Sequence, residues 1–180
     1  NDKPMARMYV DDIYGYNKKE YAESIFGTVD EAHPGVQRVM ALNDTLIGGE
    51  IELLEDLENP FKDYTLTPQE SRVLFREKGW ETIVAFQTRN VAHVGHEFLQ
   101  KTAATFVAGL FIKDEVILKA YDELIKHYYP KDITHMSILR YEMKYAGPKE
   151  AIHHALMRKN FGCTHIIIGR DHAGVGSYYG

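Results

Sequence analysis

From residue 61 onward, short apolar runs alternate with longer stretches in which apolar residues recur every three or four positions. The short runs predict buried strands, and the longer stretches predict helices. Strands are expected at 82–86, 133–139 and 164–169, and helices at 68–78, 94–108, 116–128 and 149–159. Because strands alternate with helices, the pattern indicates an α/β domain with a parallel sheet and right-handed crossovers.

Residues 1–60 follow a different pattern. Short β-prone pieces at 7–10, 37–42 and 45–51 alternate with turn-rich segments, and one short helix is expected at 19–26. This indicates a small, mainly β module. We therefore divide the chain into a partial N-terminal β-rich module, 1–60, and an α/β domain, 61–180.

Composition narrows the class of protein. Hydrophobic residues make up 44% and charged residues 26%, as in soluble globular proteins, and no apolar run is long enough to cross a membrane. The net charge of −5, without clustered lysines and arginines, argues against nucleic acid as a partner. The single cysteine, Cys163, excludes an internal disulfide, and we expect a buried, inert thiol in a cytoplasmic protein.

The segment QTRNVAHVGH, residues 87–96, holds the densest polar chemistry in the chain. It follows the predicted strand 82–86 and leads into a helix, where free backbone N–H groups and the helix dipole favour anions. It also supplies a guanidinium, two amides, a hydroxyl and two imidazoles. So many polar groups at the end of an apolar strand predict an anion-binding site.

A second polar segment, GRDHAGVG at 169–176, follows the predicted strand 164–169. A glycine-rich turn is weak evidence by itself, but this turn also carries Arg, Asp and His. Ligands of open parallel sheets bind at the carboxyl ends of the strands. We therefore expect the two polar segments to form two walls of one site.

Single residues in these segments leave alternatives open. His93 and His96 can be capping histidines, a metal pair with Asp171 or His172 as further ligands, or donors to a phosphate. Arg89 can make a surface salt bridge or hold a tetrahedral oxyanion. The adjacent histidines at 153–154 lie on a predicted helix and are interpreted as structural.

Taken together, the two segments and YAGPKEA at 145–151 closely resemble the ATP sulfurylase (sulfate adenylyltransferase) family. The resemblance is strong over residues 60–180. It implies a Rossmann-like nucleotidylyltransferase domain preceded by part of a PUA-like module. The shorter His-x-Gly-His element is shared with a wider group of nucleotidylyltransferases and does not identify a reaction.

The resemblance implies transfer of the adenylyl group of MgATP to sulfate, giving adenosine 5'-phosphosulfate (APS) and pyrophosphate. By the same resemblance, the reaction is expected to be reversible and to serve sulfate assimilation or dissimilatory sulfur metabolism. The implied catalytic residues are Thr88, Arg89, Asn90, His93 and His96. The implied sulfate contacts are Gln87, Arg89 and the backbone N–H of Ala173. The implied ATP contacts are Gln87, Thr88, Asn90, His93, His96, Gly169, Arg170, Asp171 and His172.

Magnesium is expected to arrive with ATP, without a tightly bound protein metal, and the protein is expected to form a homo-oligomer. The sequence departs from the family at Val91, where proline is usual, and at Val94. A Gly- and Lys-rich loop that the family carries between Ile112 and Lys113 is absent. We expect this chain to be a fragment. Two other readings stay open, another His-x-Gly-His nucleotidylyltransferase and a non-catalytic nucleotide-binding module.

Overall fold

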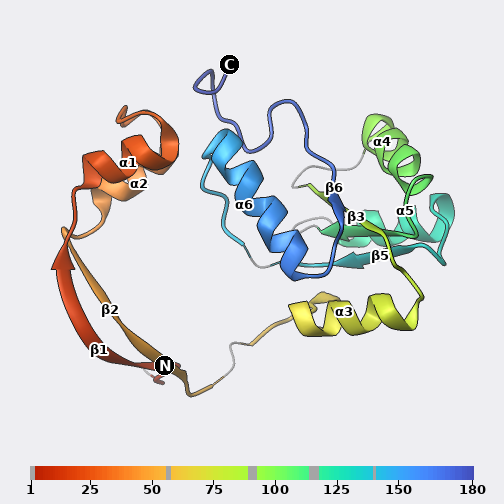
Figure 1. Cartoon of the computed structure of the whole chain (residues 1–180), viewed down its shortest axis with the longest axis horizontal. Coiled ribbons are helices and arrows are strands. Elements are labelled where there is room, and N and C mark those ends of the chain that lie inside the picture. The colour runs from red at the N-terminus through yellow and green to blue at the C-terminus, as the bar shows by residue number, and fades with distance from the viewer. Residues whose placement is uncertain (1–2, 56–57, 89–92, 114–117, 140) are drawn as a thin grey trace. The chain divides into compact units, whose positions relative to one another are not determined.

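The computed structural model describes residues 3–55, 58–88, 93–113, 118–139 and 141–180. The chain forms two compact units (Figure 1). The first unit comprises Asn1–Pro60, Lys144–Lys149 and Ala173–Gly180. The second comprises Phe61–Met143 and Glu150–His172. The first unit is therefore assembled from three separate stretches of sequence.

Two strands and two helices make up the N-terminal stretch of the first unit. The elements are β1 (Ala6–Gly15), α1 (Lys18–Phe26), α2 (Pro34–Ala41) and β2 (Thr45–Leu53). β1 and β2 pair as an antiparallel ribbon. The predicted strands at 7–10 and 45–51 and the helix at 19–26 are thereby confirmed.

The predicted strand at 37–42 is wrong, because these residues belong mainly to helix α2. His33 is the N-cap of α2, and its Nδ1 accepts hydrogen bonds from the backbone N–H groups of Gly35 and Val36. Pro34 occupies the first helical position, where its missing N–H costs nothing. These start signals outweigh the β propensity of the valines that follow.

The second unit is an α/β domain, so the predicted fold class is confirmed. Its elements are η1 (Lys62–Tyr64), α3 (Pro68–Glu77), β3 (Ile83–Gln87), α4 (Val94–Ala104), β4 (Gly109–Lys113), α5 (Leu118–Tyr128), β5 (Thr134–Ser137), the part of α6 (Gly147–Asn160) from Glu150 onward, and β6 (His165–Ile166). The strands form one sheet in the order β5-β4-β3-β6, and every pairing is parallel. Among the helices that the structure describes, none is long and apolar enough to cross a membrane.

Three details of this unit differ from the sequence prediction. Helix α4 ends at Ala104 rather than 108, and the next residues lead into β4, a strand that the apolar pattern did not reveal. The first residue of β4 is Gly109, where the Trp80 ring occupies the space of a side chain, 2.2 Å from an added Cβ. The predicted buried strand 164–169 is wrong in length and burial. Only His165 and Ile166 pair, and they lie at the sheet edge with β3 as their single neighbour.

The side chains of β3 alternate between two apolar clusters, one on each face of the sheet. Ile83 and Ala85 pack with Phe75 of α3. Val84 and Phe86 pack with Tyr121 of α5 and other residues of the opposite face. The period of two along a strand therefore directs the next residue, Gln87, to the face of Ile83 and Ala85.

Candidate active site

Both polar segments leave the sheet at the same edge. Gln87 is the last residue of β3, and Ala85, two residues before it, pairs with Ile166 of β6. Because β3 and β6 are parallel neighbours, the segments that follow them emerge side by side at their carboxyl ends. Gln87, Thr88 and residues 169–172 therefore follow neighbouring strands, as the sequence predicts, whereas their joining into one site stays a prediction. Arg89 and Asn90 lie outside the described residues.

His93 and His96 share one face of the start of α4, as their spacing predicts. His93 is the N-cap, and its Nδ1 accepts a hydrogen bond of 3.1 Å from the backbone N–H of Gly95. The two imidazole rings stack with centroids 3.9 Å apart. Because Nδ1 is an acceptor, a neutral His93 carries its proton on Nε2 and can donate it to a ligand.

Gly95 leaves the space that the His93 ring occupies. A Cβ added at this position would lie 2.9 Å from Cε1 and 3.1 Å from Nδ1 of His93. Contacts this short force the ring to move. A glycine is therefore required at this position of the His-x-Gly-His element for a steric reason: it leaves room for the capping imidazole to lie over the start of the helix.

His96 is held neutral by its surroundings. Burial lowers its pKa below the ordinary value of 6.5, and the nearby charge of His93 lowers it further. Phe86 lies on one side, with ring centroids 5.4 Å apart. The Nδ1 atom of His96 is buried and has no hydrogen-bond partner among the described residues. A neutral imidazole of this kind acts at pH 7 as a hydrogen-bonding group rather than as a fixed cation.

Gln87 and Thr88 are both half-buried at the end of β3. The Oε1 atom of Gln87 accepts a hydrogen bond from the Nη2 group of Arg158, a residue of helix α6. This contact joins the first polar segment to the helix that packs on the same face of the sheet. The sequence did not single out Arg158.

The second polar segment is more open. Gly169, Arg170 and Asp171 are exposed, whereas His172 is half-buried. The Nε2 atom of His172 lies 2.8 Å from Nδ1 of His154 on α6, a histidine interpreted from the sequence as structural. Ala173 belongs to the first unit, where its φ of 57° is left-handed although it is not a glycine. Such backbone strain is concentrated at functional sites.

Helix α6 contacts both polar segments through one buried polar stripe. Glu150, His154 and Arg158 are spaced four residues apart and are 2%, 1% and 1% exposed. Tyr141 donates a 2.9 Å hydrogen bond to Glu150, and His154 Nε2 lies 3.5 Å from the same carboxylate oxygen. The i, i+4, i+8 spacing was visible in the sequence. It was missed because a charged stripe normally faces solvent.

Within the described residues, no group of three His, Cys, Asp or Glu side chains gathers closely enough to hold a metal ion. Among the described residues, Arg158 places a buried positive charge next to the first segment. Burial lowers its pKa to about 10, so the guanidinium is still protonated at pH 7.

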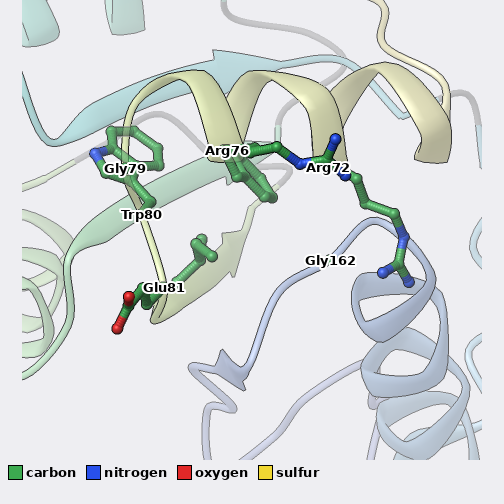
Figure 2. Close-up of a pocket in the computed structure, with 8 residues that line it drawn as sticks. Arg72, Arg76, Gly79, Trp80, Glu81 and Gly162 are labelled. Carbon is green, nitrogen blue, oxygen red and sulfur yellow. The ribbon is translucent and has the colours of Figure 1, made fainter.

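A pocket of about 460 Å³ lies near the opposite end of β3 (Figure 2). Its wall includes Arg72, Arg76, Trp80 and Glu81 and none of the residues implied in substrate binding. Arg72 donates two hydrogen bonds, 3.0 Å each, to the carbonyl oxygens of Lys159 and Asn160. It therefore caps the end of α6 and has a structural role.

Comparison with known proteins agrees with this architecture. The model of the ATP-sulfurylase family matches residues 62–180, and that of the PUA-like domain matches residues 1–56. Fold and site define an α/β protein with its polar loops at the carboxyl ends of parallel strands. The chain belongs to the ATP-sulfurylase family.

Relatives named sulfate adenylyltransferase match over nearly the whole chain. That of Pyrococcus abyssi is 61% identical over 191 residues, which is 99% of this chain and 50% of the relative. That of Halothermothrix orenii is 44% identical and covers 100% of this chain and 50% of the relative. The chain thus spans about half the length of these relatives. Since 191 aligned residues exceed the 180 of this chain, the Pyrococcus protein has residues within the match that this chain lacks.

A solved structure shares the fold. The hexameric APS kinase from Thiobacillus denitrificans superposes with a TM-score of 0.68 and 23% identity, over 92% of this chain and 31% of that protein. At this identity the similarity supports the arrangement of elements only.

Proposed function

We propose that the protein of which this chain is part is an ATP sulfurylase, which transfers the adenylyl group of MgATP to sulfate and releases pyrophosphate. The observation that carries the proposal is that Gln87 and Thr88 of the first segment, and residues 169–172 of the second, follow the neighbouring parallel strands β3 and β6. Family membership supports the reaction, and the names of the relatives agree with it. A cytoplasmic location and reversible transfer belong to the same proposal.

The proposed reaction is limited by charge rather than by proton transfer. A sulfate oxygen attacks the α-phosphorus of MgATP, the new S–O–P bond forms, and the bond to pyrophosphate breaks. Sulfate is a full anion at pH 7, so no general base is needed. Unit charges about 4 Å apart repel by about 4 kcal/mol at an effective dielectric constant near 20. Catalysis therefore consists of positioning and positive charge.

The side chains of the first segment suit this task. The family resemblance implies that Gln87 and Arg89 hold sulfate and that Thr88 and Asn90 contact the phosphates. The backbone N–H of Ala173 is a further sulfate contact that the resemblance implies. His93 and His96 would donate hydrogen bonds to the phosphates as charge builds up in the transition state. The neutral state of His96 fits a donor and does not require a base.

The second segment would hold the adenosine part of the nucleotide. The four residues implied are Gly169, Arg170, Asp171 and His172. The exposure of Arg170 and Asp171 leaves them accessible to a ligand, and His154 supports His172 from within the domain. Magnesium is written here as part of the substrate MgATP.

Sulfate-dependent release of pyrophosphate tests the proposal. We expect the purified protein to release pyrophosphate from MgATP when sulfate is added, and faster still with molybdate, a tetrahedral mimic whose adenylyl product hydrolyses. Release driven instead by a mononucleotide or a phosphorylated alcohol would favour another His-x-Gly-His nucleotidylyltransferase. Nucleotide binding without any release would favour a non-catalytic module.

Arg89 is the sharpest single test of the sulfate assignment. We expect Arg89→Ala to lower the sulfate-dependent rate about 10²- to 10³-fold, as for loss of one transition-state donor, with nucleotide binding largely kept. Kinetics with sulfate varied at saturating ATP measure the rate, and calorimetry with an ATP analogue measures binding. A variant that forms adenylyl sulfate at the wild-type rate would remove Arg89 from the site.

Self-association stays a prediction of the family resemblance. The mass of the protein in solution, measured by light scattering, tests it directly.

A further inference from the structure

Arg158 is a buried cation on helix α6. Its side chain is 1% exposed, and within the described part of the chain its guanidinium makes no ion pair with a carboxylate. Nε and Nη1 are also without hydrogen-bond partners there. A buried charge is costly unless it is compensated. Its hydrogen bond to Gln87, the one it makes to a described residue, is at the edge where the substrate anion is proposed to bind.

The contact with Arg158 fixes the orientation of the Gln87 amide. A guanidinium has donors only, so the end of the amide that faces it must be the oxygen. The N–H₂ end of Gln87 then faces away from Arg158. An anion requires donors, and an amide that was free to flip would present its oxygen to the anion part of the time.

We propose that Arg158 is a positioning residue of the anion site, which holds Gln87 with its N–H₂ group toward sulfate and lends the site a fixed buried positive charge. This inference rests on the proposed function and extends it to helix α6. It also explains why the helix turns charged residues inward while Ile152 and Leu156 are 63% and 55% exposed.

Arg158→Met separates this role from a structural one. Methionine is similar in length but neither donates nor carries charge. We expect the KM for sulfate to rise about 10- to 100-fold, as for loss of a charged hydrogen bond, with the KM for ATP little changed. Since the variant removes an uncompensated buried charge, thermal stability should be kept or raised. A merely structural arginine gives the opposite result, lower stability with an unchanged KM for sulfate.

Two further variants sharpen the test. Arg158→Lys keeps the charge and the ability to donate, but not the planar guanidinium, so we expect a smaller rise in the KM for sulfate. Gln87→Met removes the amide on which Arg158 acts. If Arg158 works through Gln87, adding Arg158→Met to Gln87→Met should raise the KM for sulfate much less than it does in the wild type. Fully additive effects would overturn the proposal.

Ser71→Ala provides the matched control for loss of a buried polar contact. Ser71 is 0% exposed, and its hydroxyl hydrogen-bonds the carbonyl oxygens of Pro68 at 3.0 Å and Phe161 at 2.7 Å, both outside the polar segments. We expect lower stability and an unchanged KM for sulfate. The same rise in KM in both variants would overturn the role of Arg158.

Direct binding distinguishes failure of this inference from failure of the proposed function. The rise in Tm with sulfate concentration reports binding without turnover. Wild-type protein that binds sulfate but releases no pyrophosphate contradicts the proposed reaction, and Arg158→Met is then judged by its weaker sulfate-induced shift. Equal shifts in both proteins, or no shift in either, overturn the inference.

Discussion

At the residue scale, the His-x-Gly-His element is a steric unit as well as a chemical one. The His93 ring lies over Gly95, where it caps α4, and in this position it also stacks on the ring of His96. Burial then keeps His96 neutral. The local geometry fixes which ring nitrogen of His93 carries the proton and so which atom can reach a phosphate.

Gly95→Ala should displace the His93 ring, because the added Cβ would lie 2.9 Å from Cε1. We expect activity to fall by at least about tenfold, as when one phosphate donor is misplaced, with a small change in stability. Steady-state kinetics and thermal melts measure the two effects. Gly48→Ala is the control, since its Cβ meets only Tyr14 at 3.9 Å. Equal effects of both substitutions would contradict the steric account.

Acid should destabilise the protein through half-buried histidines whose neutral form the fold favours. Burial, and secondly the charge of Lys78, lowers the pKa of His135 from 6.5, and His96 shifts the same way. Near and below pH 6.5 these histidines therefore bind protons more readily in the unfolded chain than in the folded chain. The free energy of unfolding consequently falls as pH drops below 6.5.

His135→Gln removes one of these groups outside the site. We expect its free energy of unfolding to fall less between pH 7 and 5 than that of the wild type, as measured by urea titrations across about two pH units. The matched control is His127→Gln, at an exposed position on α5. A pH slope unchanged by His135→Gln would show that His135 titrates alike in both states.

At the element scale, N-terminal capping residues determine where helices form more strongly than the intrinsic propensities of the residues that follow. Thr67 and Pro68 predict the start of α3, and the helix has a full capping box. Thr67 Oγ1 accepts from the Glu70 N–H at 3.2 Å, and the Glu70 carboxylate accepts from the Thr67 N–H at 2.7 Å. The same kind of signal, His33 followed by Pro34, turns β-prone residues into α2.

Thr67→Ala should cost about 1 kcal/mol of stability, the usual value for loss of an N-cap. Thr67→Ser keeps the hydroxyl and should cost far less. Denaturant unfolding of the two variants measures the difference, which does not involve the site. A loss of the same size in both would mean that the threonine methyl group, rather than its hydroxyl, stabilises α3.

At the scale of the whole molecule, one buried histidine joins distant stretches of sequence in the first unit. Nε2 of His33 lies 3.0 Å from both the Tyr145 carbonyl oxygen and the Tyr179 hydroxyl. Its Nδ1 caps α2, so the neutral ring donates from Nε2. The unit therefore depends on contacts across more than 100 residues, which no local pattern encodes.

His33→Ala should loosen this unit. We expect a loss of about 1–3 kcal/mol for the buried groups left unpaired, and faster proteolysis within 173–180. Limited proteolysis followed by mass spectrometry locates the cut. His127→Ala, at an exposed position, serves as the control. Cleavage of 173–180 at the same rate in both variants would contradict the role of His33.

The sequence by itself determined the α/β class, the α3 start and the placement of both polar segments after strands. These depend on periodicity, caps and turns, which are local. It also carried the family motifs, and with them the residues of the candidate site. The strand β4 was not predicted from the sequence, because its short apolar run closely follows a helix of similar composition.

Only the tertiary structure decided which buried charges serve the site. The four-residue spacing of charged groups from Glu150 to Arg158 is typical of a helix stripe that faces solvent. In the structure this stripe is buried, because β3 directs Gln87 toward α6. Likewise the exposure of β6 follows from its place at the sheet edge. Burial of a charge depends on partners far away in sequence, so periodicity cannot reveal it.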